Sequence, residues 1–353
     1  MTEQHVALPQ WAWAFGRPDC RATLRTTPED FVVDEVLGFD PQGEGNHAFL
    51  HIRKRNTNTA WVAQQLAELA GVPLSEVGYA GLKDRRAVTT QHFTVNLSGK
   101  LEPDWQRLAS EELVFLDITR HRRKLRRGEL RENCFRITLR GLVGECALET
   151  RLQRVLTEGV PNYFGEQRFG RHGNNLTMAQ AMFRGEHRER DRQLRGLYLS
   201  AARSWLFNKV LSARVEQGNW NRALPGESLI SNGTTSAFSV RILSRDIEQQ
   251  VSRGSLHPSG PLWGQGRPTS LADALALEMA VLEEEALFCR GLEQAGLQQE
   301  RRPLRLPVKA LQWSYVDRET LQLSFTLQPG AYATSVLREV VQADSADALS
   351  HQQ

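Results

Sequence analysis

The segment from Val77 to Gln91 contains the residues best suited to chemistry. Asp84 lies there, directly after Lys83 and directly before Arg85 and Arg86. Nearby cations favour the charged form of a carboxylate, whereas burial opposes it. An ionised, well-positioned aspartate can act as a nucleophile, and the same cations can hold phosphate groups. The alternative is a surface turn with an Asp–Arg ion pair, which contributes little to stability.

A second segment is strongly basic. Residues 118–131 contain seven basic side chains and one acidic side chain, a local charge of +6 in a chain whose net charge is +3. Such a cluster favours a polyanionic partner. The alternative is a solvated basic loop in front of a strand. The cations expected to bind RNA phosphates are Lys83, Arg122, Arg123, Lys124, Arg126 and Arg127.

Aromatic and amide side chains follow in three places. Asn133 can form a hydrogen bond with a base edge, and Phe135 can stack on a base that has left a helix. Because Phe135 alternates with Ile137, the alternative is a core phenylalanine. Residues 159–174, with four glycines, predict a rigid loop at a domain junction or in the wall of an RNA cleft. Tyr332 could face a ligand or close the core.

Composition narrows the class of protein. The 353 residues suggest about two domains, and the 40% hydrophobic content allows a sizeable core. Neither a run of 18 apolar residues nor a secretory signal pattern is present, which argues against a membrane protein. Phosphate-loop, zinc-protease and serine-hydrolase motifs are absent, so we expect an enzyme without cofactor or metal. The widely spaced cysteines disfavour a disulfide framework and fit a cytoplasmic protein: Cys20, Cys134, Cys146 and Cys289.

Periodicity indicates the elements that must position these residues. A helix is expected from Asn58 or Thr59 to Gly71, because asparagine and threonine cap helix starts and glycine ends helices. Residues 257–261 and 301–307 are rich in proline, which interrupts helices and sheets. Alternation predicts strands at 31–33, 48–52, 93–97, 135–139, 311–316 and 321–327, and helical spacing predicts helices at 148–156, 178–215, 271–292 and 336–341, before a frayed tail from about 343.

The motifs together resemble the tRNA pseudouridine synthase D (TruD) family. They occur in the family's order over nearly the whole chain. The matching segments are PEDFVVDE at 28–35, GYAGLKDRRAVTTQ at 78–91, KLRRG with NCF at 124–135, GVPNYFGEQRFG at 159–170, HPSGPLWG at 257–264 and PGAYATSVLRE at 329–339.

The resemblance implies an α+β fold. A pseudouridine-synthase catalytic domain with a mixed, largely antiparallel sheet is interrupted by a mostly helical TRUD insertion domain. The catalytic domain is expected at 1–158 and 307–353, and the insertion at 159–306. This agrees with the strand-rich start, helical middle and strand-rich end predicted from periodicity.

The resemblance also implies a reaction, the isomerisation of uridine to pseudouridine in tRNA, at position 13 in bacterial members. Asp84 matches the nucleophile, Phe31, Asn133 and Phe135 match residues that hold the target base, and Tyr332 takes the place of an aromatic residue at the site. Glu132 departs from the family, which usually has a small residue there. The implied partner is tRNA, without cofactor, metal or membrane, and we expect a cytoplasmic monomer.

The chemistry leaves two routes open. The N1–C1′ bond must break and C5 must bond C1′, so the Asp84 carboxylate either attacks the sugar or removes a sugar proton. Arg25 or Lys83 could orient the carboxylate. Two other classes remain: a non-catalytic RNA-binding protein that kept the cleft, and a metal-dependent phosphoryl-transfer enzyme, for which the chain lacks clustered carboxylates.

Overall fold

The computed structural model describes residues 8–144 and 147–345. The chain forms two compact units, which we call the helical unit and the sheet unit after their contents. No helix among the described residues has the length and apolar character that crossing a membrane requires. The predicted domain boundaries follow the family's architecture rather than packing, and they stay a prediction. The helical unit comprises Met1–Pro18, Ala147–Pro307 and Ala331–Val340, and the sheet unit Asp19–Cys146, Val308–Gly330 and Val341–Gln353.

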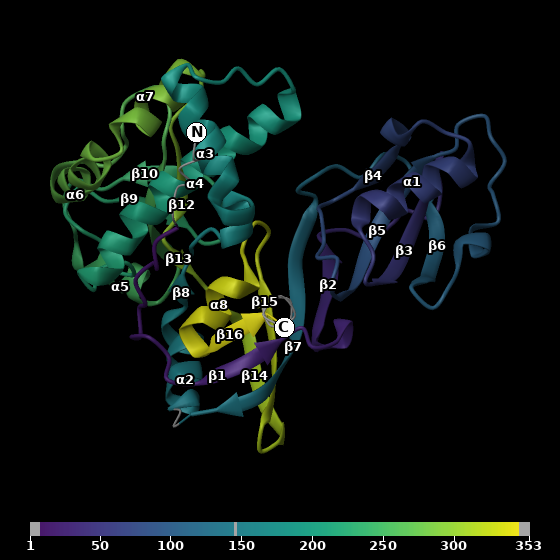
Figure 1. The fold of residues 1–353 in the computed structure, drawn as a ribbon, viewed down its shortest axis with the longest axis horizontal. Helices are drawn as coiled ribbons and strands as arrows, with labels where there is room; N and C mark the ends of the chain where they lie inside the picture. Colours follow the sequence, from purple (N-terminus) through teal and green to yellow (C-terminus); the bar gives the residue numbers. More distant parts are fainter. Residues whose placement is uncertain (1–7, 145–146, 346–353) are drawn as a thin grey trace. The chain divides into compact units, whose positions relative to one another are not determined.

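The sheet unit is built on one mixed sheet of ten strands (Figure 1). The order of its paired strands is β14-β15-β7-β2-β5-β3-β6. In addition, β1 pairs with β7 and β16, and β4 pairs with β5. Pairs β2–β5 and β1–β16 are parallel and the others antiparallel, which confirms the expected sheet. The strands are β1 Arg21–Leu24, β2 Phe31–Leu37, β3 His47–Arg55, β4 Val77–Tyr79, β5 Val88–Asn96, β6 Leu113–His121, β7 Leu130–Val143, β14 Lys309–Asp317, β15 Thr320–Leu327 and β16 Gln342–Ser345.

Helix α1 (Thr59–Ala70) confirms the predicted caps. The Asn58 side chain accepts a hydrogen bond from the Ala60 N–H, and Gly71 ends the helix in the left-handed region that glycine favours. The helix lies over β4 and β5 (Figure 1). Its apolar side packs on the inward residues of β3 and β5 and makes the core of this part of the sheet: Val62, Ala63, Leu66 and Ala67 against Ala48, Leu50, Ile52, Phe93 and Val95.

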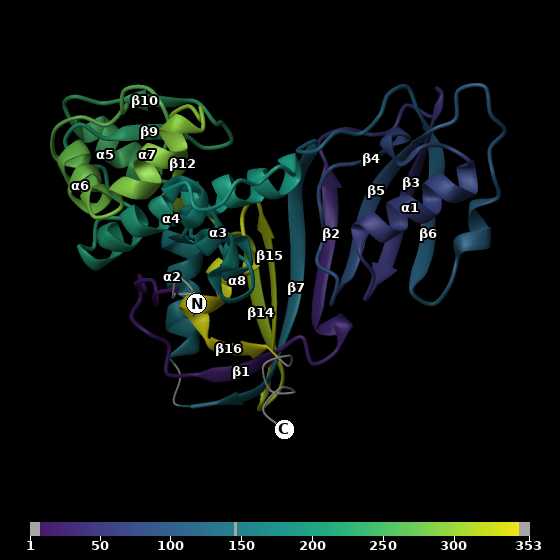
Figure 2. The same ribbon diagram turned by 45° about the horizontal axis from the view of Figure 1, so that its top comes forward.

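The helical unit surrounds the long helix α4 (Arg192–Glu216). Helix α4 packs against α3 (Asn174–Arg184), α6 (Ala272–Glu283) and α7 (Ala286–Gln294) (Figure 2). Its buried face carries aromatic and aliphatic side chains at helical spacing, which confirms helix over most of 178–215. The prediction missed the break at 185–191, where Gly185 ends α3 in the left-handed region before α4 begins. The remaining helices are α2 Leu148–Glu158, α5 Arg245–Ser252 and α8 Ala333–Val340.

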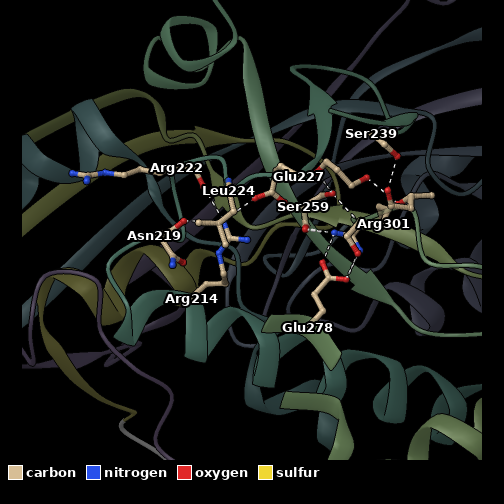
Figure 3. A network of polar contacts seen from close by, with 12 residues as sticks. Arg214, Asn219, Arg222, Leu224, Glu227, Ser239, Ser259, Glu278 and Arg301 are labelled. Carbon is tan, nitrogen blue, oxygen red and sulfur yellow. Dashed lines mark hydrogen bonds and ion pairs between the residues drawn. The ribbon is translucent and has the colours of Figure 1, made fainter. Parts of the chain in front are cut away.

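Two buried ion pairs fix the interior of the helical unit (Figure 3). Arg214 of α4 meets Glu227 at 2.9 Å, and Arg301 meets Glu278 of α6 at 2.7 Å. Burial raises the pKa of Glu227, although Arg214 opposes the shift. The Arg301 guanidinium also donates to Ser259 Oγ at 3.0 Å. Removing one partner would leave the other charge buried and unpaired, so loss of any of these four charged side chains should destabilise the helical unit.

The proline-rich segment 257–261 lies within one strand, which corrects the prediction for that segment. β11 (Leu256–Leu262) is buried and pairs with β9 (Ser228–Ser231) through its first half and with β12 (Glu300–Pro303) through its second half. The strand changes partner after Pro258, so Pro258 lies in the part that pairs with β9 and Pro261 in the part that pairs with β12. Neither proline has to fit into a hydrogen-bonded ladder that runs the whole length of the strand.

In 301–307 the prediction is confirmed, because one short strand ends at Pro303 and the next ends before Pro307. The other short strands are β8 Val160–Pro161, β10 Ala237–Ser239 and β13 Arg305–Leu306.

The cysteine expectation also needs a correction. Cys20 is disulfide-bonded, whereas Cys134 and Cys289 are free thiols. The expected frayed tail is wrong for its first residues, because β16 pairs with β1. The rest of that prediction, from residue 346, lies outside the described residues.

Candidate active site

Asp84 lies in the loop between β4 and β5 of the sheet unit. Side chains from β3, α1 and β5 hold this loop by its backbone, so the carboxylate is carried on a fixed segment. The bonds run from Gln91 Nε2 to the Gly81 carbonyl at 2.6 Å, from Lys54 Nζ to the Asp84 carbonyl at 3.1 Å and from the Lys83 N–H to Thr59 Oγ1 at 3.1 Å.

The Asp84 carboxylate is paired with Arg25. Arg25 Nη2 donates to Asp84 Oδ1 at 3.0 Å, and 35% of the Asp84 side chain stays exposed. The backbone φ of Arg25 is +61°, in the left-handed region that residues other than glycine rarely adopt. The guanidinium also lies 4.1 Å from the centroid of the Phe31 ring. Arg25 is therefore held between the carboxylate and an aromatic ring, with some backbone strain.

Lys83 takes a different partner. Its ammonium lies 2.7 Å from Glu35 Oε2, and the two side chains are 6% and 0% exposed. Glu35 Oε1 also accepts a hydrogen bond from the His92 N–H at 3.0 Å. His92 follows the β5 residues 88–90, which pair with β2. Burial acts to raise the pKa of Glu35, but His92 and Lys83 together outweigh burial and leave that pKa lowered. This geometry favours support of the loop by Lys83, and its predicted contact with RNA stays a prediction.

Lys54 is a fully buried cation beneath the Asp84 loop. Its ammonium donates to the Thr57 carbonyl at 2.7 Å and to the Asp84 carbonyl at 3.1 Å, with 0% of the residue exposed. Burial lowers the pKa of Lys54 to about 8, although Asp84 opposes the shift. Neither Lys54 nor Glu35 was among the residues predicted from the motifs.

The predicted base-holding residues of the sheet unit share one face of β2 and β7. Glu35 is opposite Asn133, Val33 is opposite Phe135, and Phe31 lies two residues before Val33. The rings of Phe31 and Phe135 pack edge to face with centroids 6.1 Å apart, and Phe135 also stacks on Phe325. The structure thus brings Asp84, Phe31, Asn133 and Phe135 into one unit, where Arg25 joins the carboxylate to the rings.

Asn133 carries an unused acceptor. Its Oδ1 atom is buried and has no hydrogen-bond partner among the described residues. Glu132, the departure from the family, is neutralised by Lys309, whose ammonium lies 2.6 Å from its carboxylate. The extra negative charge is therefore balanced locally.

The basic cluster lies on the loop between β6 and β7. Arg122 pairs with Glu44, and Arg123 pairs with Glu129. Arg126 and Arg127 have no carboxylate within ion-pair distance among the described residues. The last member of the predicted set, Lys124, donates to the Ser75 carbonyl.

Tyr332 belongs to the helical unit. Its hydroxyl accepts hydrogen bonds from Arg168 at 2.7 and 3.2 Å, and its ring lies 6.2 Å from that of Phe164. Both partners belong to the glycine-rich segment 159–174. A rigid loop without helix was predicted there, whereas the segment contains the short strand β8 and two short 3-10 helices, Glu166–Phe169 and Arg171–Gly173. The expected contact between Tyr332 and the target base stays a prediction.

The described residues include no group of three or more histidine, cysteine or acidic side chains placed to hold a metal ion. The arrangement around Asp84 instead offers a partly exposed carboxylate, a guanidinium that orients it and the edge of an apolar cluster. These groups can act on a sugar carbon or a sugar proton.

Comparison with known proteins connects this arrangement to one family. The family model described as tRNA pseudouridine synthase D (TruD) matches residues 11–190 and 187–340. A curated tRNA pseudouridine synthase D from Methylococcus capsulatus is 52% identical over 332 residues, 94% of each chain. Another, from Aeromonas salmonicida, is 49% identical over 340 residues, 96% of each chain.

A solved structure from Methanosarcina mazei that carries the same family name has the same fold. Its TM-score is 0.71 at 21% sequence identity, and the match covers 94% of this chain and 96% of that one. It confirms the predicted fold class, and the curated relatives confirm the resemblance read from the motifs. The chain belongs to the tRNA pseudouridine synthase D (TruD) family.

Proposed function

We propose that this protein isomerises a uridine of tRNA to pseudouridine, with the Asp84 carboxylate as the reacting group and without a cofactor. The observation that carries the proposal is the partly exposed Asp84 carboxylate, which lies 3.0 Å from the Arg25 guanidinium. The guanidinium itself packs over the Phe31 ring. A carboxylate that acts on a nucleoside must be both accessible and fixed in direction, and this one is both. The modified position is 13, as in bacterial members of the family, and the protein acts as a cytoplasmic monomer.

The proposed reaction needs no external reagent, because the substrate and product are isomers. The N1–C1′ bond breaks, the uracil ring turns, and C5 bonds to C1′. C5 then releases its proton and N1 takes one up, so the composition does not change. Asp84 either attacks the sugar or removes a sugar proton, and both routes need the charged carboxylate beside C1′. On the second route the sugar proton that Asp84 removes is returned to the sugar when C5 bonds to C1′. Arg25 fixes the direction of the Asp84 carboxylate through its ion pair at 3.0 Å.

The target uridine must first leave its stack, which costs a few kcal/mol. Phe31 and Phe135 are core residues, 2% and 8% exposed, so the base meets the edge of this apolar cluster beside Arg25 and does not lie on an open ring face. The free Oδ1 of Asn133 is an acceptor suited to the N3–H of uracil.

The test is a pair of matched substitutions. Asp84→Asn removes the charge at nearly constant volume, and we expect turnover to fall by at least about 10²- to 10⁴-fold while tRNA binding persists. Asp117→Asn, at an exposed position of β6, is the control and retains activity. Pseudouridine-specific chemical mapping of a tRNA transcript measures the product. Comparable turnover by Asp84→Asn would remove this carboxylate from its role. Binding without turnover by the unaltered protein would favour a non-catalytic RNA-binding protein.

A further inference from the structure

A cavity of about 450 Å³ opens in the sheet unit beside the start of α1. Apolar side chains of α1 and β4 line one part of it, including Ala63 and Val77, and Tyr79 adds an aromatic ring. Lys124, Arg126 and Arg127 line the remainder. The cavity thus combines an apolar wall, one aromatic ring and three cations, without an acidic side chain.

The wall of the cavity is fixed by close backbone contacts. A Cβ atom on Gly78 would lie 2.4 Å from the Leu125 carbonyl oxygen, so only glycine lets the basic loop approach β4 this closely. The Leu125 N–H donates to Thr94 Oγ1 at 2.9 Å, and the Gly128 N–H donates to the Ala80 carbonyl at 2.7 Å. The cations are therefore held in place next to the strand that leads to Asp84.

The charges of the basic cluster divide in a way that selects this cavity. Arg122 and Arg123, which do not line it, are paired with carboxylates. Arg126 and Arg127, which do line it, have no such partner among the described residues. The Arg127 guanidinium lies 5.9 Å from the centroid of the Tyr79 ring. The cations still available to an anion are the ones around the cavity.

These features match the chemistry of one nucleotide. The aromatic ring and apolar wall suit a base, and the unpaired guanidinium groups suit its phosphate. The volume falls within the range of about 300–1,000 Å³ that is usual for small-molecule sites. Tyr79 lies five residues before Asp84, and five residues of extended chain span at most roughly 18 Å. An occupant of the cavity therefore lies within a few nucleotides of the reacting uridine.

We propose that this cavity binds a second, unpaired nucleotide of the RNA substrate, different from the uridine that reacts. The proposal rests on the proposed function and adds where the substrate is recognised. The base lies against Tyr79, and Arg126 and Arg127 hold the phosphate.

The test combines protein and RNA changes in one cycle. Ligated tRNA transcripts carry a single abasic nucleotide at each position flanking the target in turn, and their dissociation constants are measured at fixed salt. With the parent protein, one flanking position weakens binding by roughly 5- to 100-fold, the loss of one stacked base. With Tyr79→Leu, intact RNA binds more weakly by a similar factor and the abasic change at that position costs nothing more. Tyr79→Phe keeps the ring and behaves like the parent.

A second variant covers the case in which Tyr79→Leu does not fold. Ala60→Leu fills the cavity from the exposed start of α1, and Gln64→Leu, one turn further along, is its matched control outside the lining. Ala60→Leu abolishes the position-specific loss, and Gln64→Leu preserves it. If the protein substitution and the abasic change weakened binding additively at every flanking position, that result would overturn the proposed nucleotide site. Absence of pseudouridine from reactions of the parent protein would overturn the proposed function instead, since binding is measured separately.

Discussion

Lys54 should link the activity of this protein to pH through the backbone of Asp84. Its buried ammonium donates to the Asp84 carbonyl at 3.1 Å, and burial lowers its pKa to about 8 from an ordinary value of 10.5. Above pH 8 the ammonium loses its charge, and the hydrogen bond that anchors the loop becomes weaker. Turnover should then fall with the charged fraction of Lys54, to about a tenth one pH unit above its pKa.

Stability should change in the opposite direction. Lowering the pKa of Lys54 from 10.5 to about 8 corresponds to about 3 kcal/mol against the charged form. Because the pKa is lower in the folded chain, the unfolded chain holds more protons between about pH 8 and 10.5. The contribution of Lys54 to folding stability therefore rises through that window and is lost as the pH falls through 8.

Lys54→Met separates the two effects. At pH 7 it removes the cost of about 3 kcal/mol but leaves the Thr57 and Asp84 carbonyls without their donor, at about 1–3 kcal/mol each. The two contributions partly cancel, so the free energy of unfolding should change by no more than a gain of about 1 or a loss of about 3 kcal/mol relative to the parent. Turnover should nevertheless drop at least about tenfold, because the loop that carries Asp84 has lost an anchor.

The assay measures single-turnover rates and thermal unfolding from pH 7 to 9.5 for the parent, Lys54→Met and Lys54→Arg. The parent should lose activity above pH 8 while Lys54→Met, already slow, shows a flatter profile. Lys54→Arg keeps its charge throughout this range, and its activity should not decline near pH 8. Parallel alkaline losses in the parent and Lys54→Met would refute the role given to this ammonium.

Two further changes test other parts of the fold. Gly78→Ala should weaken RNA binding and cost about 1–3 kcal/mol of stability, because its Cβ atom would lie 2.4 Å from the Leu125 carbonyl oxygen. Gly81→Ala is the control, because the atoms nearest to its Cβ lie at 3.9 Å. In a filter-binding assay, Gly81→Ala should bind RNA normally and Gly78→Ala should not. His257 accepts a hydrogen bond from Arg305, and burial together with the Arg305 charge lowers the pKa of His257 to about 4. The unfolded chain therefore holds more protons than the folded chain between pH 4 and 6.5. Calorimetry should show that the parent loses more folding stability on acidification through this range than His257→Gln does.

The framework of the fold could be predicted from the sequence where local signals agree. Asn58 and Gly71 bound α1 because one caps a helix start and the other adopts the left-handed region at its end. Strict alternation from Leu321 to Leu327 predicted β15, which pairs with β14 as an antiparallel hairpin. In contrast, Pro258 and Pro261 lie in a strand because β11 changes partner, which depends on chain segments far away in the sequence.

The site was predicted less fully, because its support comes from residues distant in sequence. Asp84, Phe31, Asn133 and Phe135 were found through motifs. The partner of Asp84, Arg25, is 59 residues away and held in a left-handed backbone that its sequence does not signal. Lys83 is adjacent to Asp84, yet its charge is paired with Glu35.

The strand patterns nevertheless contain a signal for Lys54 and Glu35, the two charged residues that the motifs did not predict. The inward positions of β3 run Ala48, Leu50, Ile52 and then Lys54, and those of β2 run Phe31, Val33 and then Glu35. A charge at an inward position is costly unless something meets it, so it marks a place where the core gives way to a polar site. The register makes these places adjacent, since Lys54 is opposite Thr89, Thr89 is opposite Val33, and Glu35 is opposite Asn133. One polar patch on an otherwise apolar face therefore supports the loop of Asp84, and it follows from alternation once the pairing of the strands is known.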